Sequence, residues 1–206
     1  MTADVGRERD TFYIPAKAEA MSWEGWRYKL IRRNMKTMIH AKCIDAKVRL
    51  ALYGMLEYSA MKLFPRRMKN VSIKLHLKHY DYEGEAMIEE GTKTKNPRNF
   101  KIIIDPYRME KDDWGRELAY SEWVSKILRT LGHEMVHVKQ YIMGELTFPR
   151  GALTWHGEKV GWMTEDEYYS SPHEVEAYGK EKWLQLGYTT VWNEIQSREG
   201  NKLQIL

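Results

Sequence analysis

The spacing of apolar residues along the chain changes between residues 43 and 106. Residues 43–64 (CIDAKVRLALYGMLEYSAMKLF) place apolar side chains every three or four positions, which predicts an amphipathic helix that ends before Pro65. Residues 71–78 (VSIKLHLK) alternate between apolar and polar, which is the period of a half-buried strand. A short stretch at 86–90 and a β-branched stretch at 100–106 predict two further strands. The strands together predict a small antiparallel or mixed sheet that follows the helix.

The helical period returns near Ser121. This residue is a candidate N-cap, and Glu122 places a negative charge in the first turn, where the helix dipole favours it. Gly144 is a suitable residue to end the helix. The predicted apolar stripe comprises Trp123, Val124, Ile127, Leu128, Leu131, Met135 and Val138.

Three other segments complete the prediction. Residues 22–40 mix aromatic and basic residues and are expected to form a helix of uncertain extent. Residues 147–163 predict a loop and a small hairpin around His156-Gly157. A last helix is expected to begin after Ser171-Pro172, where serine can cap and proline suits the first turn, and to run to about residue 187.

Composition places the chain among folded globular proteins. Its 206 residues are 43% hydrophobic and 30% charged, which is enough for one compact α+β domain, expected over residues 43–206, with an N-terminal arm and helix over residues 1–42. The single cysteine, Cys43, excludes an internal disulfide framework or a cysteine-rich zinc ribbon. No apolar run is long enough to span a membrane, and the N-terminus lacks the pattern of a secretory signal. We therefore expect an intracellular protein without a membrane partner.

Charge is distributed unevenly. Residues 1–80 hold 17 Lys+Arg and 7 Asp+Glu, whereas the remaining residues hold 16 and 22. A basic half is compatible with a nucleic-acid partner. Because the basic residues are dispersed among helical positions, we favour a solvated face over a nucleic-acid site.

The predicted helix around residue 130 carries the sequence His133-Glu134-Met135-Val136-His137. Histidines at positions i and i+4 leave the same face of a helix one turn apart, so both imidazoles can bind one zinc ion. Glu134 lies about 100° further round the helix, where its carboxylate can take a proton from a zinc-activated water without being a ligand. The pattern alone also fits two exposed histidines, but the apolar stripe and the preceding strands favour a zinc site.

A third ligand is expected from SPHEVEA at the start of the last helix. Glu174 and Glu176 are two residues apart and point in different directions, so only one of them can face the metal. Glu176 has a lysine partner at Lys180, one turn on, whereas the face of Glu174 continues through the small residue Ala177. We therefore favour Glu174 over Glu176, with His173 as a weaker alternative.

The two motifs HEMVH and Glu174-x-x-Ala177 resemble those of zincin metallopeptidases of the gluzincin type, and most closely the short bacterial and phage-encoded forms. The resemblance covers residues 119–186. It implies His133, His137 and Glu174 as zinc ligands and Glu134 as general base. It also implies an edge strand, expected within residues 100–106, that aligns an extended protein or peptide substrate.

One position departs from the family pattern. Many members have Asp or Asn directly after the alanine, where it orients a ligand histidine, but this chain has Tyr178. Either the tyrosine hydroxyl replaces that group or the partner of the histidine comes from elsewhere. The donor that stabilises the oxyanion is likewise open among His156, Tyr168, Tyr169 and His173.

Three classes of function follow. The first is a zinc metallopeptidase that hydrolyses peptide bonds. The second is a structural or binding protein with the zincin fold, such as a phage virion or assembly component, which has little or no turnover. The third is a nucleic-acid-associated protease similar to the SprT-like group, which the basic N-terminal half suits.

Overall fold

A computed structural model describes residues 35–41, 44–92, 95–112, 114–161 and 163–198. These residues form a mixed α+β structure, as the sequence predicts. The elements in chain order are β1 (Lys36–His40), α2 (Ala46–Leu63), β2 (Ser72–Leu77), β3 (Gly84–Ile88), β4 (Asn99–Ile104), α3 (Tyr120–Met143), β5 (Leu146–Thr147), the 3-10 turn η1 (Pro149–Gly151), β6 (Thr154–Trp155), β7 (Glu158–Lys159), α4 (Glu165–Tyr169) and α5 (Pro172–Arg198).

The main sheet has the strand order β1-β2-β4-β3. Strands β1, β2 and β4 run parallel, and β3 runs antiparallel to β4. The sheet is therefore mixed, and β3 lies at its edge whereas β4 lies inside. The prediction of an edge strand within residues 100–106 is wrong, because β4 pairs with β2 along one edge and with β3 along the other.

Strand β1 corrects a second prediction. Residues 36–40 form a strand in which the side chains of Thr37 and Ile39 are less exposed than their neighbours, so this part of the expected helix over residues 22–40 is wrong. Alternation between a β-branched and an exposed residue fits a strand better than a helix. Strand β1 pairs with β2, so it belongs to the main sheet although the domain was expected to start at residue 43. The rest of the expected helix, residues 22–34, lies outside the described residues.

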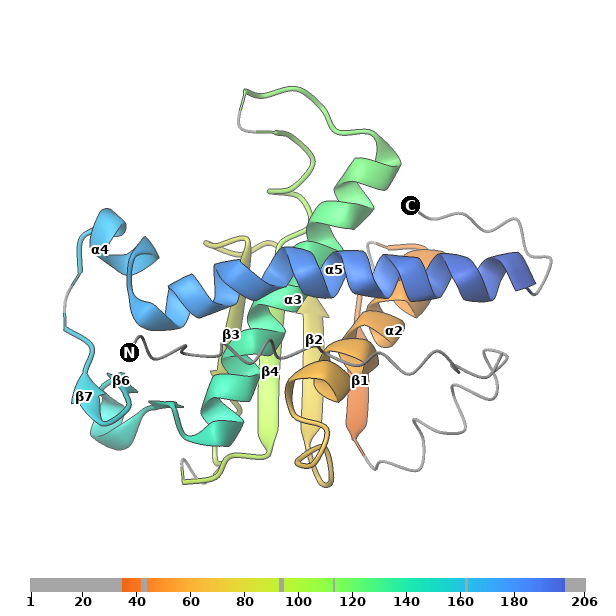
Figure 1. Cartoon of the computed structure of the whole chain (residues 1–206). Coiled ribbons are helices and arrows are strands. Elements are labelled where there is room, and N and C mark those ends of the chain that lie inside the picture. The colour runs from red at the N-terminus through yellow and green to blue at the C-terminus, as the bar shows by residue number, and fades with distance from the viewer. Residues whose placement is uncertain (1–34, 42–43, 93–94, 113, 162, 199–206) are drawn as a thin grey trace, which may run out of the picture.

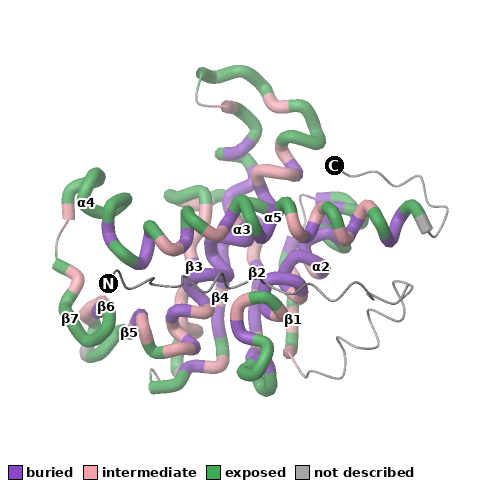
Figure 2. Tube along the Cα trace, in the orientation of Figure 1, coloured by how far each residue is buried: buried purple, intermediate pink, exposed green. Residues whose placement is uncertain are grey.

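The three long helices lie on one face of the sheet (Figure 1). Helix α3 packs on β3 and β4, and α5 packs across α2 and α3. Buried residues gather where these layers meet, while α4 and the loop before α3 are exposed (Figure 2). None of the helices in the described part of the chain has the length and apolar character needed to cross a bilayer.

The boundaries of α2 and α3 follow from local chemistry. Asp45 caps α2 by accepting a hydrogen bond from the backbone N of Val48 at 2.9 Å, and the helix ends before Pro65 as predicted. Helix α3 starts one residue earlier than predicted, so Ser121 is inside the helix and Ala119 is the N-cap. Glu122 accepts from the backbone N of Ala119 at 2.9 Å, so the side chain at the third helical position satisfies the backbone N–H of the N-cap residue.

The predicted end of α3 at Gly144 is confirmed, since this glycine adopts the left-handed conformation with φ 75°. The expected hairpin around His156-Gly157 is also confirmed, as β6 and β7 pair across these two residues. Helix α5 begins at Pro172 as predicted but continues beyond residue 187 to Arg198.

Two reciprocal contacts hold α5 against α2. A Cβ atom on Gly54 of α2 would overlap the ring of Tyr188 from α5, and a Cβ atom on Gly187 of α5 would overlap the hydroxyl of Tyr58 from α2. Both tyrosines are buried, and their rings lie 5.9 Å apart. Each glycine therefore leaves space for an aromatic side chain from the opposite helix, and this packing fixes the position of α5.

Candidate metal centre

Helix α3 brings His133 and His137 together on its face towards α5. Each histidine is only 8% exposed, and their Nε2 atoms lie 3.1 Å apart. The apolar stripe predicted for this helix is buried in the core on the other side. Two donors on one metal in tetrahedral geometry, each at about 2.05 Å, lie roughly 3.3 Å apart. The observed separation of the two nitrogen atoms is close to that spacing.

Glu174 completes the cluster from the first turn of α5. Its Oε2 lies 3.1 Å from Nε2 of His133, and its Oε1 lies 3.3 Å from Nε2 of His137. The carboxylate is 2% exposed. Among the described residues, His133, His137 and Glu174 form a buried group whose ligand atoms all lie within 4.8 Å of one another, so the group can hold a metal ion.

The structure places Glu176 away from this group. Its carboxylate is bound by Lys139 at 2.7 Å and by Gln140 at 3.0 Å, and it accepts a hydrogen bond from Lys180, the partner expected from the sequence. The first of these contacts places Glu176 on the side of α5 that faces the end of α3. Of the two candidate carboxylates, only Glu174 lies with the two histidines.

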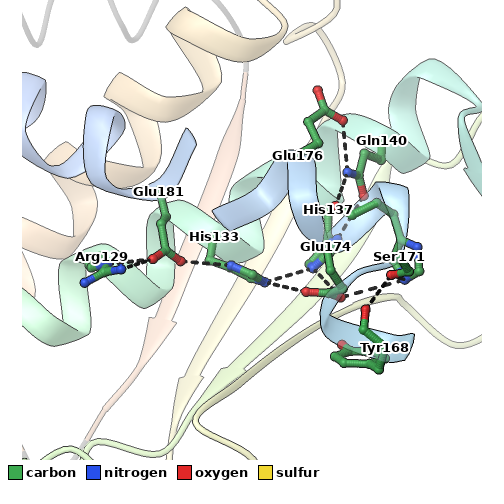
Figure 3. A network of polar contacts seen from close by, with 10 residues as sticks. Arg129, His133, His137, Gln140, Tyr168, Ser171, Glu174, Glu176 and Glu181 are labelled. Atoms are coloured by element: carbon green, nitrogen blue, oxygen red, sulfur yellow. Dashed lines mark hydrogen bonds and ion pairs between the residues drawn. The ribbon is translucent and has the colours of Figure 1, made fainter. Parts of the chain in front are cut away.

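A row of charged side chains supports His133 (Figure 3). Its Nδ1 lies 3.0 Å from Oε2 of Glu181, and Glu181 in turn accepts a hydrogen bond from Nε of Arg129 at 2.6 Å. An Nδ1–H that donates to Glu181 leaves the Nε2 lone pair directed at the cluster. Glu181 therefore takes the orienting role that the sequence left open, while the ring of Tyr178 packs edge-on against His133 at 4.6 Å.

Gln140 supports His137 in the same way. Its Oε1 lies 2.9 Å from Nδ1 of His137, and its Nε2 donates to the carbonyl of His173 at 2.9 Å. Because the amide nitrogen already faces two oxygen acceptors, the amide oxygen must face the imidazole, which holds His137 in the Nδ1–H tautomer. Both histidines thus present Nε2 to the same point.

Glu134 lies beside the cluster without joining it. The side chain is 4% exposed, and its Oε2 has no hydrogen-bond partner among the described residues. A Cβ atom on Gly84, the first residue of β3, would stand 2.6 Å from Oε1 of Glu134. The glycine therefore allows the carboxylate to lie directly against the edge strand.

Burial and neighbouring charges shift the pKa values of these groups. Burial raises the pKa of Glu134, in opposition to the two histidines. Burial alone would lower the pKa of His133, but its hydrogen bonds to Glu174 and Glu181 raise it to about 9. Burial alone would raise the pKa of Glu174, but the hydrogen bonds from His133 and His137 hold it well below its usual range. Without a metal, protons on the histidines compensate the buried carboxylates.

The four oxyanion candidates are placed differently. Burial and the nearby carboxylate of Glu174 raise the pKa of the Tyr168 hydroxyl in α4 well above its usual value, and the ring of Tyr169 packs on Tyr178 at 5.9 Å. His173 is buried, with its Nε2 3.8 Å from Oε1 of Glu174. His156 lies in the β6–β7 turn, where its ring packs on Trp155. Tyr168 and His173 are therefore the two candidates that lie next to the carboxylate of Glu174.

Sequence reasoning missed Arg129, Gln140 and Glu181. Their spacing was a usable signal, because Arg129 stands one turn before His133 and Gln140 stands three residues after His137. Glu181 stands seven residues after Glu174, which is two turns along the same face of α5. Helical spacing could therefore have predicted these three residues as neighbours of the cluster, in the same way as it predicts the two histidines.

Comparison of the chain with protein-family models, curated proteins and solved structures finds no match. The geometry of the cluster and the residues around it therefore carry the functional interpretation.

Proposed function

We propose that the protein is a zinc-dependent peptidase of zincin-like architecture, in which Glu134 is the general base. One observation carries the proposal: a buried carboxylate with an unpartnered oxygen lies beside a His–His–Glu cluster and is not part of it. A structural zinc site would not need such a group, whereas hydrolysis needs a proton acceptor next to the metal. The order of sheet, α3 and α5 is the order that the HEMVH and Glu-x-x-Ala motifs imply.

The donor set favours zinc as the metal. Two neutral imidazole nitrogens and one carboxylate are a common ligand set for catalytic zinc and leave a fourth position open. The hydrogen bonds at Nδ1 of His133 and His137 support this choice, because each holds a proton on Nδ1 and leaves Nε2 as the nitrogen that would bind the metal. Zinc, when bound, lowers the pKa of a water molecule and polarises the scissile carbonyl.

The protein supplies the proton transfers. Glu134 accepts the proton that the attacking water loses and delivers it to the amine as the peptide bond breaks. Burial raises the pKa of its carboxyl group, and this strengthens it as a base. The hydroxyl of Tyr168, beside Glu174, can donate to the substrate oxygen as it becomes negative.

The substrate is aligned on β3. Among the described residues this strand pairs with β4 alone, and its other edge is where an extended peptide would pair through backbone hydrogen bonds. Gly84 at the start of β3 lies against Glu134. A peptide paired along this edge therefore passes beside the general base. The resemblance to zincin metallopeptidases implies an edge strand with this role.

The decisive experiment is metal analysis combined with the Glu134→Gln variant. We expect about one zinc per chain in the wild type and the variant, since Glu134 is not a ligand. Hydrolysis of a mixed library of quenched fluorescent peptides should fall by about 100-fold to 10,000-fold in the variant, the range for loss of a general base. Glu176→Gln is the matched control, because it removes a neighbouring carboxylate and should retain hydrolysis.

Two results would contradict the proposal. Protein purified without chelators that holds no zinc and takes up none would exclude the metal centre. Zinc-loaded wild type that hydrolyses no more than Glu134→Gln would favour the alternative of a structural or binding protein built on the same fold.

A further inference from the structure

The edge strand beside the metal centre is strongly acidic. Residues 81–90 (DYEGEAMIEE), which comprise β3 and its flanking residues, include five acidic residues and no basic one. The first part of this segment is the part next to Glu134, through Gly84. Negative charge is therefore concentrated where a substrate backbone would pair.

Nearby cations neutralise only part of this charge. Lys126 of α3 lies 2.8 Å from Glu83, and Lys74 of β2 pairs with Glu89. Glu85 instead accepts a hydrogen bond from the neutral hydroxyl of Tyr80, and no lysine or arginine of the described residues forms an ion pair with it. Glu85 thus adds an uncompensated negative charge beside Gly84.

Helix α4 brings further acidic residues close to the centre. The ring of its Tyr168 lies 6.2 Å from that of His173, and the ring of Tyr169 lies 5.9 Å from that of Tyr178, so the end of α4 lies close to the cluster. Glu165 stands three residues before Tyr168 and four before Tyr169, on the same face of the helix. Glu165 and Asp166 are exposed, and neither forms an ion pair within the described part of the chain.

A second observation shows that this region is built to receive a ligand. The Oε2 atom of Glu134 is buried without a partner at the point where β3 and α3 meet, and such an atom costs free energy unless something binds it. The edge of β3, which pairs with no other strand of the described residues, adds backbone groups next to that atom. Acidic residues therefore lie near a site where a buried carboxylate oxygen of Glu134 can accept a hydrogen bond from a ligand.

We propose that the metal centre takes cationic substrates: peptide segments rich in lysine or arginine, paired along β3 between Glu85 and the acidic turn of α4. The inference rests on the proposed peptidase function for its site, although it concerns binding and not the chemical step. Opposite charges on neighbouring strands attract, and a surface of one sign raises the local concentration of the oppositely charged ligand. Charged residues on an edge strand can also serve to prevent edge-to-edge pairing between protein molecules. If that were their only role here, the protein would show no preference among peptides of different charge.

The test measures binding without turnover. Zinc-loaded Glu134→Gln protein is titrated into fluorescent peptides that are long enough to pair with the five residues of β3 and that differ only in carrying lysine, glutamine or glutamate at alternate positions. We expect the lysine peptide to bind about tenfold more tightly than the glutamine peptide, and the glutamate peptide to bind most weakly. Raising the salt concentration should reduce the difference, because the charges are exposed.

Two further variants locate the effect. Glu85→Gln combined with Glu165→Gln should bring the lysine and glutamine peptides to within about twofold of each other, since the unpaired acidic side chain beside Gly84 and the one on the tyrosine face of α4 are both neutralised. Glu194→Gln is the matched control, because this exposed residue of α5 stands twenty residues, or about 30 Å, beyond Glu174 and should leave the preference unchanged.

The outcomes separate this inference from the proposed function. Equal binding of the lysine and glutamine peptides, or a preference that persists in the double variant, would overturn the cationic substrate class even if the wild type hydrolyses peptides. A salt-sensitive preference for the lysine peptide would support it even if the wild type hydrolyses none of the three, and in that case the peptidase activity is the part that fails.

Discussion

The two halves of α5 contribute opposite kinds of interaction. The first half places Glu174 and Glu181 in the interior, where they contact His133 from both sides of its ring. The second half places Leu184, Tyr188 and Trp192 in the apolar core against α2 and α3. One continuous helix therefore carries buried charge at its beginning and apolar packing towards its end.

This difference shows how a buried charged centre can be held in place. Glu174 and Glu181 are both paired, but the cost of removing such charges from water offsets much of their attraction, so burial of the first half of α5 against α3 adds little net stability. Each large apolar side chain of the second half contributes about 1.5–3 kcal/mol when buried. The apolar packing of the second half thus fixes the position of the helix. Because the helix is continuous, this packing also keeps Glu174 within reach of the histidines.

Replacing Glu174 should have the largest effect on the first half. Glu174→Ala removes one of three protein ligands and leaves two histidines with no carboxylate between them, so zinc affinity should fall by more than about 100-fold, the upper range for loss of an outer hydrogen-bond partner. Glu176→Ala should retain zinc, because Glu176 is bound to Lys139 and Lys180. Competition with a chromophoric chelator measures both affinities. Loss of zinc only from Glu176→Ala would show that the other carboxylate is the ligand.

Replacing Gly187 tests the second half. A Cβ atom would overlap the buried hydroxyl of Tyr58, and overpacking of this kind costs about 1–3 kcal/mol, against a gain of up to about 1 kcal/mol in helix propensity. We expect Gly187→Ala to lower the free energy of unfolding by about 1–2 kcal/mol in urea, with one zinc still bound per chain. Gly179→Ala is the control on the same helix, since nothing lies within 4 Å of the added atom. If Gly187→Ala released zinc at low urea, the two halves would not act separately.

Replacing Glu181 tests the outer partner of the centre. Loss of a group that orients a ligand histidine typically weakens metal binding by about 10–100-fold, and Glu181→Ala also leaves Arg129 unpaired. Glu181→Gln should lose less, because the amide oxygen can still accept from Nδ1 of His133. Tyr178→Phe should bind zinc as the wild type does, and an effect as large as that of Glu181→Ala would instead assign the orienting role to the tyrosine hydroxyl.

The sequence was sufficient to predict those features that depend on the spacing of residues a few positions apart. The stripe of α3, the strand at residues 72–77 and the joint placement of His133 and His137 all follow from positions a few residues apart. The choice between Glu174 and Glu176 also rested on local spacing, since Lys180 was visible one turn from Glu176.

Features that depend on distant contacts could not be predicted in this way. Alternation marks residues 99–104 as a strand but carries no information on which strands flank it, so the edge position was assigned to the wrong strand. The pairing of Gly54 with Tyr188 joins residues on different helices. The alternation of residues 36–40 is short and follows a stretch of aromatic and basic residues that suggests a helix. Their strand is stabilised by pairing with β2, which lies after α2 in the sequence.

The pH dependence of zinc binding gives the finest test of the first half of α5. Two carboxylates raise the pKa of His133 to about 9 in the metal-free protein, above its ordinary value of 6.5, so this proton stabilises the metal-free fold below pH 6.5 and the contribution is lost as the pH rises through about 9. Zinc must displace the same proton. Because the pKa of His137 is raised as well, we expect zinc affinity to rise at least tenfold per pH unit between pH 7 and about 9 and then to level off, while the metal-free protein becomes less stable over that range. Titrations in buffers of different ionisation enthalpy count the protons released. In Glu181→Gln the plateau should begin at lower pH, because one of the two carboxylates that hold the proton is gone, and an unchanged profile would show that Glu181 does not act on His133.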